Sequence, residues 1–127
     1  MAQRIMRQDG ELAARTAGIG VWQYDMASER LTWDAQMFRV FDVDPSQFGH
    51  SVADFMACLH PDDQGGIGEE LALALNASEQ FEMEFRIVTR AGDERFVFGS
   101  GRIERDANGQ SVTVVGVNLD VTARKVV

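Results

Sequence analysis

Apolar and polar residues alternate along the last third of the chain with a period of two. Every second residue of the segment 80–88 is apolar, in the order Phe81, Met83, Phe85 and Ile87. This alternation predicts a strand with one buried face and one largely wet face. Two further strands are predicted over 94–104 and 112–121, after turns at Ala91-Gly92-Asp93 and Asp106-Ala107-Asn108-Gly109, because Asn-Gly is a strong hairpin signal. We therefore expect the chain to end in an antiparallel meander of three strands.

Shorter elements precede this meander. Two strands are predicted over 19–25 and 30–33, and the polar turn between them makes them a hairpin. Apolar spacings of three and four residues predict helices over 4–16, from Asp34 through Phe41, over 51–59 and over 62–77. Their expected N-caps, after the first, are Asp34, Ser51 and then Asp62 or Asp63. The Asp44-Pro45 pair is expected to stop the helix that follows Asp34.

Length and charge narrow the class of protein. A chain of 127 residues is the size of one domain and can bury a real core. Its 20 acidic and 12 basic residues give a net charge of −8, which disfavours nucleic acid as a partner because binding to phosphates depends on clustered Lys and Arg. The single cysteine, Cys58, cannot form an intramolecular disulfide, and no segment has the apolar run of a secretion signal or a membrane span. We expect a cytosolic domain, whose parent protein could still be anchored in a membrane.

Several short motifs together resemble those of a PAS domain. They run in the family's order and at its usual spacings over about residues 17–125, as Gly18-Ile19-Gly20-Val21-Trp22 with Asp25, His60-Pro61-Asp62-Asp63, Glu84-Phe85-Arg86, Gly92, Asp106 to Gly109, Gly116 and Asp120-Val121-Thr122. The resemblance implies an α+β fold with a five-stranded antiparallel sheet, of strand order 2-1-5-4-3, and short helices across one face. It divides the chain into an N-terminal flanking helix (1–17), a sensor domain (18–122) and the start of a C-terminal signalling helix (123–127). It also implies a larger signalling protein, commonly a histidine kinase or a cyclic-dinucleotide enzyme.

Residues that could carry catalysis are isolated, so we expect no enzymatic activity from this domain. His60 is expected to be a corner or cap residue, and Asp62 and Asp63 are explained by helix capping, since adjacent helical residues point apart. The residues around Cys58 differ from those that surround the flavin-reactive cysteine of light-sensing relatives. We therefore expect Cys58 to be a buried, unreactive thiol. The helix 62–77 has no histidine for haem, and no cluster has the spacing of a zinc site. Haem, covalent flavin photochemistry and a metal site are thus disfavoured, and the cofactor stays open.

Strand parity and the family comparison together predict an inner cleft between the sheet and the helices. The residues assigned to it are Trp22, Tyr24, Met83, Phe85, Val97, Gly99, Gly101, Gly116 and Asn118. The glycines remove side-chain volume, which leaves either a cavity for a small planar or apolar ligand or space that Trp22 and Phe85 fill. The sequence favours the second alternative, in which the aromatic residues are simply core.

The opposite parity places an apolar row on the outer face of the sheet. It consists of Phe96, Phe98, Val115, Val117 and Leu119, continued by Val121. An apolar surface of this size usually marks an interface. The expected cover is the N-terminal helix, through Ile5, Met6 and Leu12, or a second copy of the domain in a homodimer.

The end of the last strand is predicted to be the signal junction. Thr122 can cap a helix that begins at Ala123, and Asp120 could hold Arg124 or Lys125 by a charge-assisted bond. In related domains this junction couples the sheet to a helix that reaches the effector in the same polypeptide. The predicted function is a sensory module that passes a change in the cleft or the dimer interface to that effector. The alternative is a dimerisation or relay module that binds no ligand.

Overall fold

The computed structural model describes residues 18–77 and 79–125. The helix predicted over 4–16, and with it the flanking segment 1–17, lies outside the described residues. None of the helices in the described ranges is long and apolar enough to cross a lipid bilayer.

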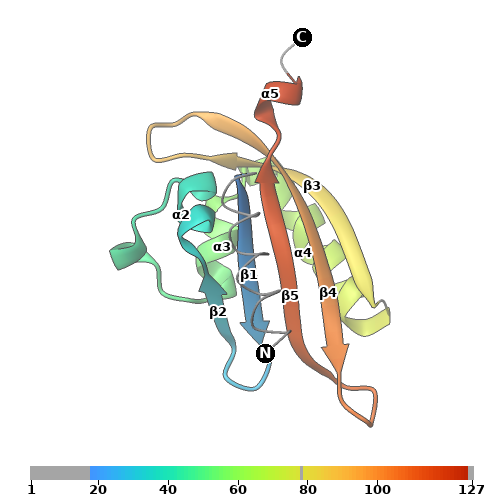
Figure 1. Ribbon diagram of the computed structural model, residues 1–127. Coiled ribbons are helices and arrows are strands. Elements are labelled where there is room, and N and C mark those ends of the chain that lie inside the picture. The colour runs from blue at the N-terminus through green and yellow to red at the C-terminus, as the bar shows by residue number, and fades with distance from the viewer. Residues whose placement is uncertain (1–17, 78, 126–127) are drawn as a thin grey trace.

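Five strands form one antiparallel sheet in the order β2-β1-β5-β4-β3 (Figure 1). The strands are β1 (Ile19–Asp25), β2 (Arg30–Trp33), β3 (Gln80–Val88), β4 (Glu94–Arg105) and β5 (Ser111–Asp120). The last strand in sequence, β5, lies between β1 and β4 and so occupies the centre of the sheet. This is the sheet and the strand order that the family resemblance implied.

The turns of the meander contain the conformations that only glycine adopts without strain. Gly92, between β3 and β4, has a φ of 89°, and Gly109, between β4 and β5, has a φ of 78°. The side chain of Asp106 accepts from the backbone N–H groups of Asn108 and Gln110, which stabilises the second turn. Both predicted hairpins are confirmed.

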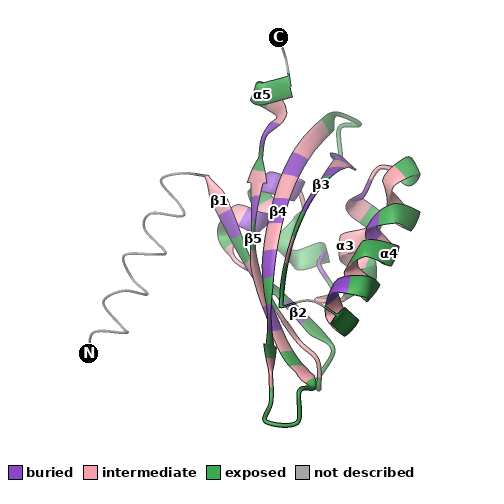
Figure 2. Cartoon of the chain, turned by 90° about the vertical axis from the view of Figure 1, so that its right-hand side faces the viewer, coloured by how far each residue is buried: buried purple, intermediate pink, exposed green. Residues whose placement is uncertain are grey.

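Short helices cover the inner face of the sheet, and Figure 2 shows α3 and α4 on one side of it. These helices are α2 (Ala35–Phe41), α3 (Val52–Cys58) and α4 (Pro61–Ala77), with a 3₁₀ turn at Pro45–Gln47. The terminal α5 (Thr122–Lys125) follows β5 and lies beyond the end of the sheet (Figure 1). Asp34 caps α2 by accepting from the N–H of Met37 at 2.9 Å, and Ser51 caps α3 by accepting from Asp54 at 3.1 Å. Both caps are those predicted.

The stop signal of α2 differs from the prediction, although the helix reaches Phe41 as predicted. The helix ends at Phe41, because Asp42 adopts the left-handed conformation (φ 55°) and donates its N–H back to the last turn. The Asp44-Pro45 pair, expected to stop this helix, instead begins the 3₁₀ turn, in which Asp44 accepts from the N–H of Ser46. Asp42 in turn pairs with Arg90 at 2.8 Å, a partner 48 residues away that local sequence cannot reveal.

The core consists of two clusters with a group of aromatic residues between them. In the larger cluster the Trp33 ring stacks on Phe48, with 4.2 Å between ring centroids, and lies 4.8 Å from Phe41. The smaller cluster contains Ala74, Ile103 and Val114. Three partly buried residues contact both clusters, namely Trp22, Tyr24 and Phe81. Space between the clusters is therefore bordered by aromatic rings.

Candidate functional site

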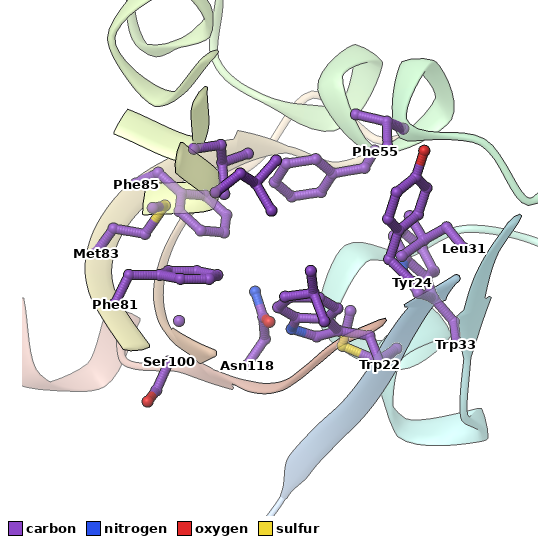
Figure 3. A pocket seen from close by; sticks show the side chains of 16 residues that line it. Trp22, Tyr24, Leu31, Trp33, Phe55, Phe81, Met83, Phe85, Ser100 and Asn118 are labelled. Atoms are coloured by element: carbon purple, nitrogen blue, oxygen red, sulfur yellow. The ribbon is translucent and has the colours of Figure 1, made fainter. Parts of the chain in front are cut away.

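A cavity of about 150 Å³ lies between the inner face of the sheet and the helices (Figure 3). The residues that line it come from all five strands and from the helices α2, α3 and α4. They are Trp22, Tyr24, Leu31, Trp33, Met37, Val52, Phe55, Leu71, Leu75, Phe81, Met83, Phe85, Gly99, Ser100, Val114 and Asn118. None of these side chains carries a formal charge. The cavity thus suits an apolar occupant with few polar groups.

Alternation along the strands aims one set of side chains into this space. Residues Met83 and Phe85 on β3 share a face with Gly99 on β4, which pairs with both Met83 and Asn118. A Cβ added at Gly99 would lie 3.5 Å from the Asn118 Nδ2 and 3.5 Å from the Phe85 ring, which is ordinary contact. Gly99 thus leaves its volume to the cavity.

Asn118 brings a polar group to the middle of this apolar space. The residue is only 4% exposed, and in Figure 3 its carboxamide points into the cavity. This carboxamide makes no hydrogen bond within residues 18–77 and 79–125, and because no fully enclosed side-chain nitrogen or oxygen lacks a partner there, its polar atoms are open to the cavity. Buried polar groups of native proteins are nearly always paired, so an unpaired amide that faces a cavity marks a place where a ligand atom can bind.

Three of the residues predicted for the cleft do not line it. The Phe81 ring covers Gly101, and the Trp22 ring covers Gly116, so that a Cβ at either glycine would overlap an aromatic ring. Val97 is fully buried in the larger core cluster. These two glycines make room for the protein's own rings. Trp22 fills space as the filled-core alternative predicted, but the second ring is Phe81 and not Phe85, and of the three glycines only Gly99 leaves space open.

The lining residues that the sequence analysis did not assign come mainly from the helices and from β2. Val52 and Phe55 lie on α3, and Leu71 and Leu75 lie on α4. Apolar spacing predicts both helices, but it does not tell which face of each helix meets the cleft. Phe81 could have been found, because it shares the parity of Met83 and Phe85. The remaining residues are Leu31, Trp33, Met37, Ser100 and Val114.

The C-terminal junction is a small hydrogen-bonded unit at the end of β5. An Asp120 carboxylate oxygen accepts from the Thr122 N–H at 2.9 Å and from the Thr122 hydroxyl. The hydroxyl oxygen of Thr122 accepts in turn from the N–H of Phe96 at 2.9 Å. The start of α5 is thus attached to both β5 and β4.

The ion pairs at this junction differ from those expected. The charged neighbour of Asp120 is Arg95, whose Nε lies 4.0 Å away, and neither Arg124 nor Lys125 fills that role. Lys125 reaches across to Glu84 on β3, with 2.7 Å between Nζ and Oε1. Arg124 is exposed and has no ion pair with the residues described here. The terminal helix is therefore attached to β3 through Lys125.

The outer face of the sheet carries a continuous apolar strip. Val117 pairs with Val21 on one side, and both are exposed, at 37% and 38%. The other predicted residues are half-buried, namely Phe96, Phe98, Val115 and Leu119. Val121, which was expected to continue the strip, is buried at 5% exposure, because β5 ends at Asp120 and the chain turns into α5.

The His-Pro-Asp-Asp corner holds α4 against β3. His60 caps α4, since its Nδ1 accepts from the N–H of Asp62 at 3.1 Å, which agrees with the corner or cap role predicted for this histidine. The prediction that Asp62 or Asp63 caps the helix is wrong. Asp63 instead binds Arg86, with 2.7 Å from Oδ1 to the guanidinium and 2.7 Å from Oδ2 to the backbone nitrogen. The hydrogen bond from the Arg86 side chain lowers the pKa of Asp63. Asp63 and Arg86 each belong to a motif of the family resemblance, but the sequence does not indicate that the two residues form an ion pair.

Cys58 has the environment of an unreactive thiol. It donates to the Asp54 carbonyl, and burial raises the pKa of the thiol to about 11. It is not one of the residues that line the cavity. In the described ranges no group of three or more His, Cys, Asp or Glu residues could hold a metal ion.

The chain is similar in sequence to a known protein family and to parts of known signalling proteins. The family model described as PAS fold matches residues 30–118. A probable diguanylate cyclase of Escherichia coli is 25% identical over 114 residues, which are 90% of this chain and 10% of that protein. A blue-light-activated histidine kinase of Brucella ovis is 27% identical over 111 residues, which are 86% of this chain and 21% of that protein. The chain thus spans between a tenth and a fifth of the length of these relatives.

Solved structures show the same fold. A sensory box histidine kinase/response regulator from Burkholderia thailandensis superposes with a TM-score of 0.76 at 23% identity, over 91% of this chain and 86% of that one. The N-terminal domain of a diguanylate cyclase with a PAS/PAC sensor from Marinobacter aquaeolei gives a TM-score of 0.75 at 16% identity, over 84% of this chain and 98% of that one.

Proposed function

The chain belongs to the PAS family, and on that premise we propose that it is the sensory module of a larger cytosolic signalling protein, with a histidine kinase or diguanylate cyclase as its effector. The module has no catalytic activity of its own. A change in the inner cavity passes along the sheet to α5 and from there to the effector. The signalling relatives carry this kind of domain within much longer chains, which supports the proposal.

The observation that carries the proposal is that the cavity and the junction share one strand. Asn118 faces the cavity, and Asp120, two residues later on β5, bonds the first residue of α5. Both strands next to β5 take part, because Gly99 on β4 and Gly20 on β1 pair with Asn118. A ligand that displaces Asn118 therefore moves the strand that holds Thr122, and it shifts the population between two orientations of the terminal helix.

A fusion of residues 1–127 to the catalytic region of a histidine kinase tests this function. Gly99→Leu places a side chain in the cavity and stands in for a ligand. We expect it to change the autophosphorylation rate by about fivefold or more, the usual lower range for coupled sites. Adding Asp120→Ala should remove the difference between the empty and the filled form.

Asp106→Ala is the matched control for Asp120→Ala. Asp106 makes the same kind of backbone hydrogen bonds at the opposite end of β5, far from α5. The response to Gly99→Leu should persist in this control. Equal rates for the wild-type and Gly99→Leu fusions, with both folded, would contradict a sensory role for the cavity.

We also propose that the outer apolar strip forms a homodimer with a second copy. The strip comprises Val21, Phe96, Phe98, Val115, Val117 and Leu119. Its two exposed valines, Val21 on β1 and Val117 on β5, lie side by side in the sheet. An exposed apolar surface of this kind is typical of an interface. The same strip favours the second candidate function, a dimerisation or relay module that needs no ligand. In that case the fused kinase depends on the strip and not on the cavity.

A further inference from the structure

The chemistry of the cavity limits what can bind there. No side chain in its wall carries a charge, so a carboxylate, a phosphate or an ammonium group would be buried without a partner. Burying an unpaired charge is strongly unfavourable. The ligand is therefore neutral.

The wall offers the ligand one well-placed polar contact. The Asn118 carboxamide, with an acceptor oxygen and two N–H donors, points into the cavity and lacks a partner in the part of the chain that the structure describes. In Figure 3 the hydroxyl of Tyr24 points away from Asn118, and the hydroxyl of Ser100 points out of the cavity. A buried water needs two to four polar partners, and one amide does not supply them. The site is thus made for a molecule with a single polar group.

The size and walls of the cavity indicate an aromatic ligand. An apolar cavity of roughly 150 Å³ in an engineered protein is large enough for benzene, and this cavity has about the same volume. The rings of Trp22 and Phe81 lie at its border, 6.3 Å apart between centroids. Phe85 contributes a third ring beside Asn118. A single aromatic ring can pack against these faces and edges.

From these observations we propose that the cavity binds a neutral molecule of one aromatic ring with one hydroxyl or N–H group, of the phenol type, which hydrogen-bonds the Asn118 carboxamide. The inference rests on the proposed function, in which the cavity is the sensing site. The ligand's hydroxyl donates to Asn118 Oδ1 and accepts from Nδ2, which satisfies the amide that is otherwise unpaired. Because Asn118 belongs to β5, a ligand bound to its carboxamide acts directly on this strand.

The test is an NMR titration of the 127-residue chain with phenol, benzene and benzoate, which is an anion at neutral pH. Phenol should bind in the cavity, benzene about tenfold more weakly because it leaves Asn118 unpaired, and benzoate not detectably. Asn118→Leu should remove the preference for phenol and retain benzene. Asn76→Leu, the same exchange on the exposed side of α4, should leave all three affinities unchanged. Gly99→Leu should abolish binding of both neutral probes.

Three results would overturn the proposal. They are binding of benzoate as tight as that of phenol, equal loss of phenol and benzene in Asn118→Leu, and no binding of any probe. The kinase fusion separates these failures from a failure of the proposed function. If no probe binds and the fusion still responds to Gly99→Leu, the ligand class is wrong and the cavity is still the sensing site. If phenol binds and the fusion does not respond, the ligand class holds and the sensory role fails.

Discussion

Glycines on the inner face of the sheet serve two different purposes. Gly101 and Gly116 accommodate the rings of Phe81 and Trp22, so the missing side chain is replaced by another residue of the same chain. At Gly99 the neighbouring atoms are at ordinary contact distance, and the missing side chain contributes to the cavity. The same residue type therefore supports the core at two positions and the candidate site at a third.

This difference predicts opposite effects of one added methyl group. In Gly116→Ala the new Cβ meets the Trp22 ring and the Ser100 carbonyl oxygen, and this overpacking should lower the free energy of unfolding by about 1–3 kcal/mol. In Gly99→Ala the methyl has room, and the free energy of unfolding should stay the same or rise by up to about 1 kcal/mol. Urea denaturation of both variants measures the two effects. Equal losses would show that Gly99 does not border open space.

The Asp63–Arg86 pair predicts how stability depends on pH. The pKa of Asp63 is lowered in the folded state, so the pair's contribution is fully present above the ordinary carboxyl pKa of 3.8 and is lost as the pH falls through the lower folded-state value. Asp63→Asn should therefore be less stable than the wild type at pH 7, and the difference should shrink on acidification below about pH 4. Urea denaturation between pH 2 and pH 7 checks this.

Asp62→Asn is the control for this prediction. Asp62 is the neighbouring carboxylate, and its side chain is 76% exposed. Its substitution should leave the acid dependence close to that of the wild type. A difference between wild type and Asp63→Asn that stays constant down to pH 2 would exclude the ion pair as the cause.

Among the elements, β5 connects the two candidate sites. Its inward residue Asn118 borders the cavity, and its outward residue Val117 belongs to the apolar strip. Its end is held by Asp120 and Thr122, and Thr122 also accepts from Phe96 on β4. A movement of β5 can thus change the cavity, the outer face and the position of the terminal helix.

Thr122→Val tests the attachment of α5 to β4. The substitution keeps the shape of the side chain and removes the hydroxyl that accepts from the Phe96 N–H. Loss of this hydrogen bond should destabilise the domain by about 1 kcal/mol. Amide hydrogen exchange should become faster at Phe96 and in α5. Thr113→Val, near the start of β5 and far from α5, should not change exchange at Phe96 or in α5. A Phe96 amide that stays protected in Thr122→Val would exclude the attachment.

What could be read from the sequence depended on how local each interaction is. Alternating residues 80–88 and the glycine turns at 92 and 109 specified the meander, because strand parity and turn conformation are decided by near neighbours. The pairing of Asp42 with Arg90 and that of Asp63 with Arg86 were missed, because each joins residues far apart in the chain. For the same reason, parity placed Gly99, Gly101 and Gly116 on the inner face but could not tell which of them an aromatic ring would cover.

At the scale of the whole molecule, the outer apolar strip predicts self-association. Val117→Lys places a charge in the middle of the proposed dimer interface, where it would be buried without a partner. We expect the dimer dissociation constant to rise at least about tenfold. Sedimentation velocity over a range of concentrations measures this. Val112→Lys is the control, because this valine is 41% exposed near the far end of β5.

Two outcomes of this experiment would contradict the proposed dimer. One is a wild-type chain that stays monomeric at high concentration. The other is an equal effect of Val112→Lys and Val117→Lys. In the first case the segment 1–17 becomes the candidate cover for the strip.

The central claim is that the state of the cavity reaches the terminal helix through β5. Backbone amide chemical shifts of wild type and Gly99→Leu test it most directly, with Gly65→Leu as a control, since Gly65 has open space around it on α4. Filling the cavity should shift the amide signals of Asn118 to Asp120 and those from Thr122 to Lys125, whereas Gly65→Leu should leave these signals in place. Shift changes in Gly99→Leu that stop at the residues lining the cavity, with Thr122 and α5 unchanged, would contradict it.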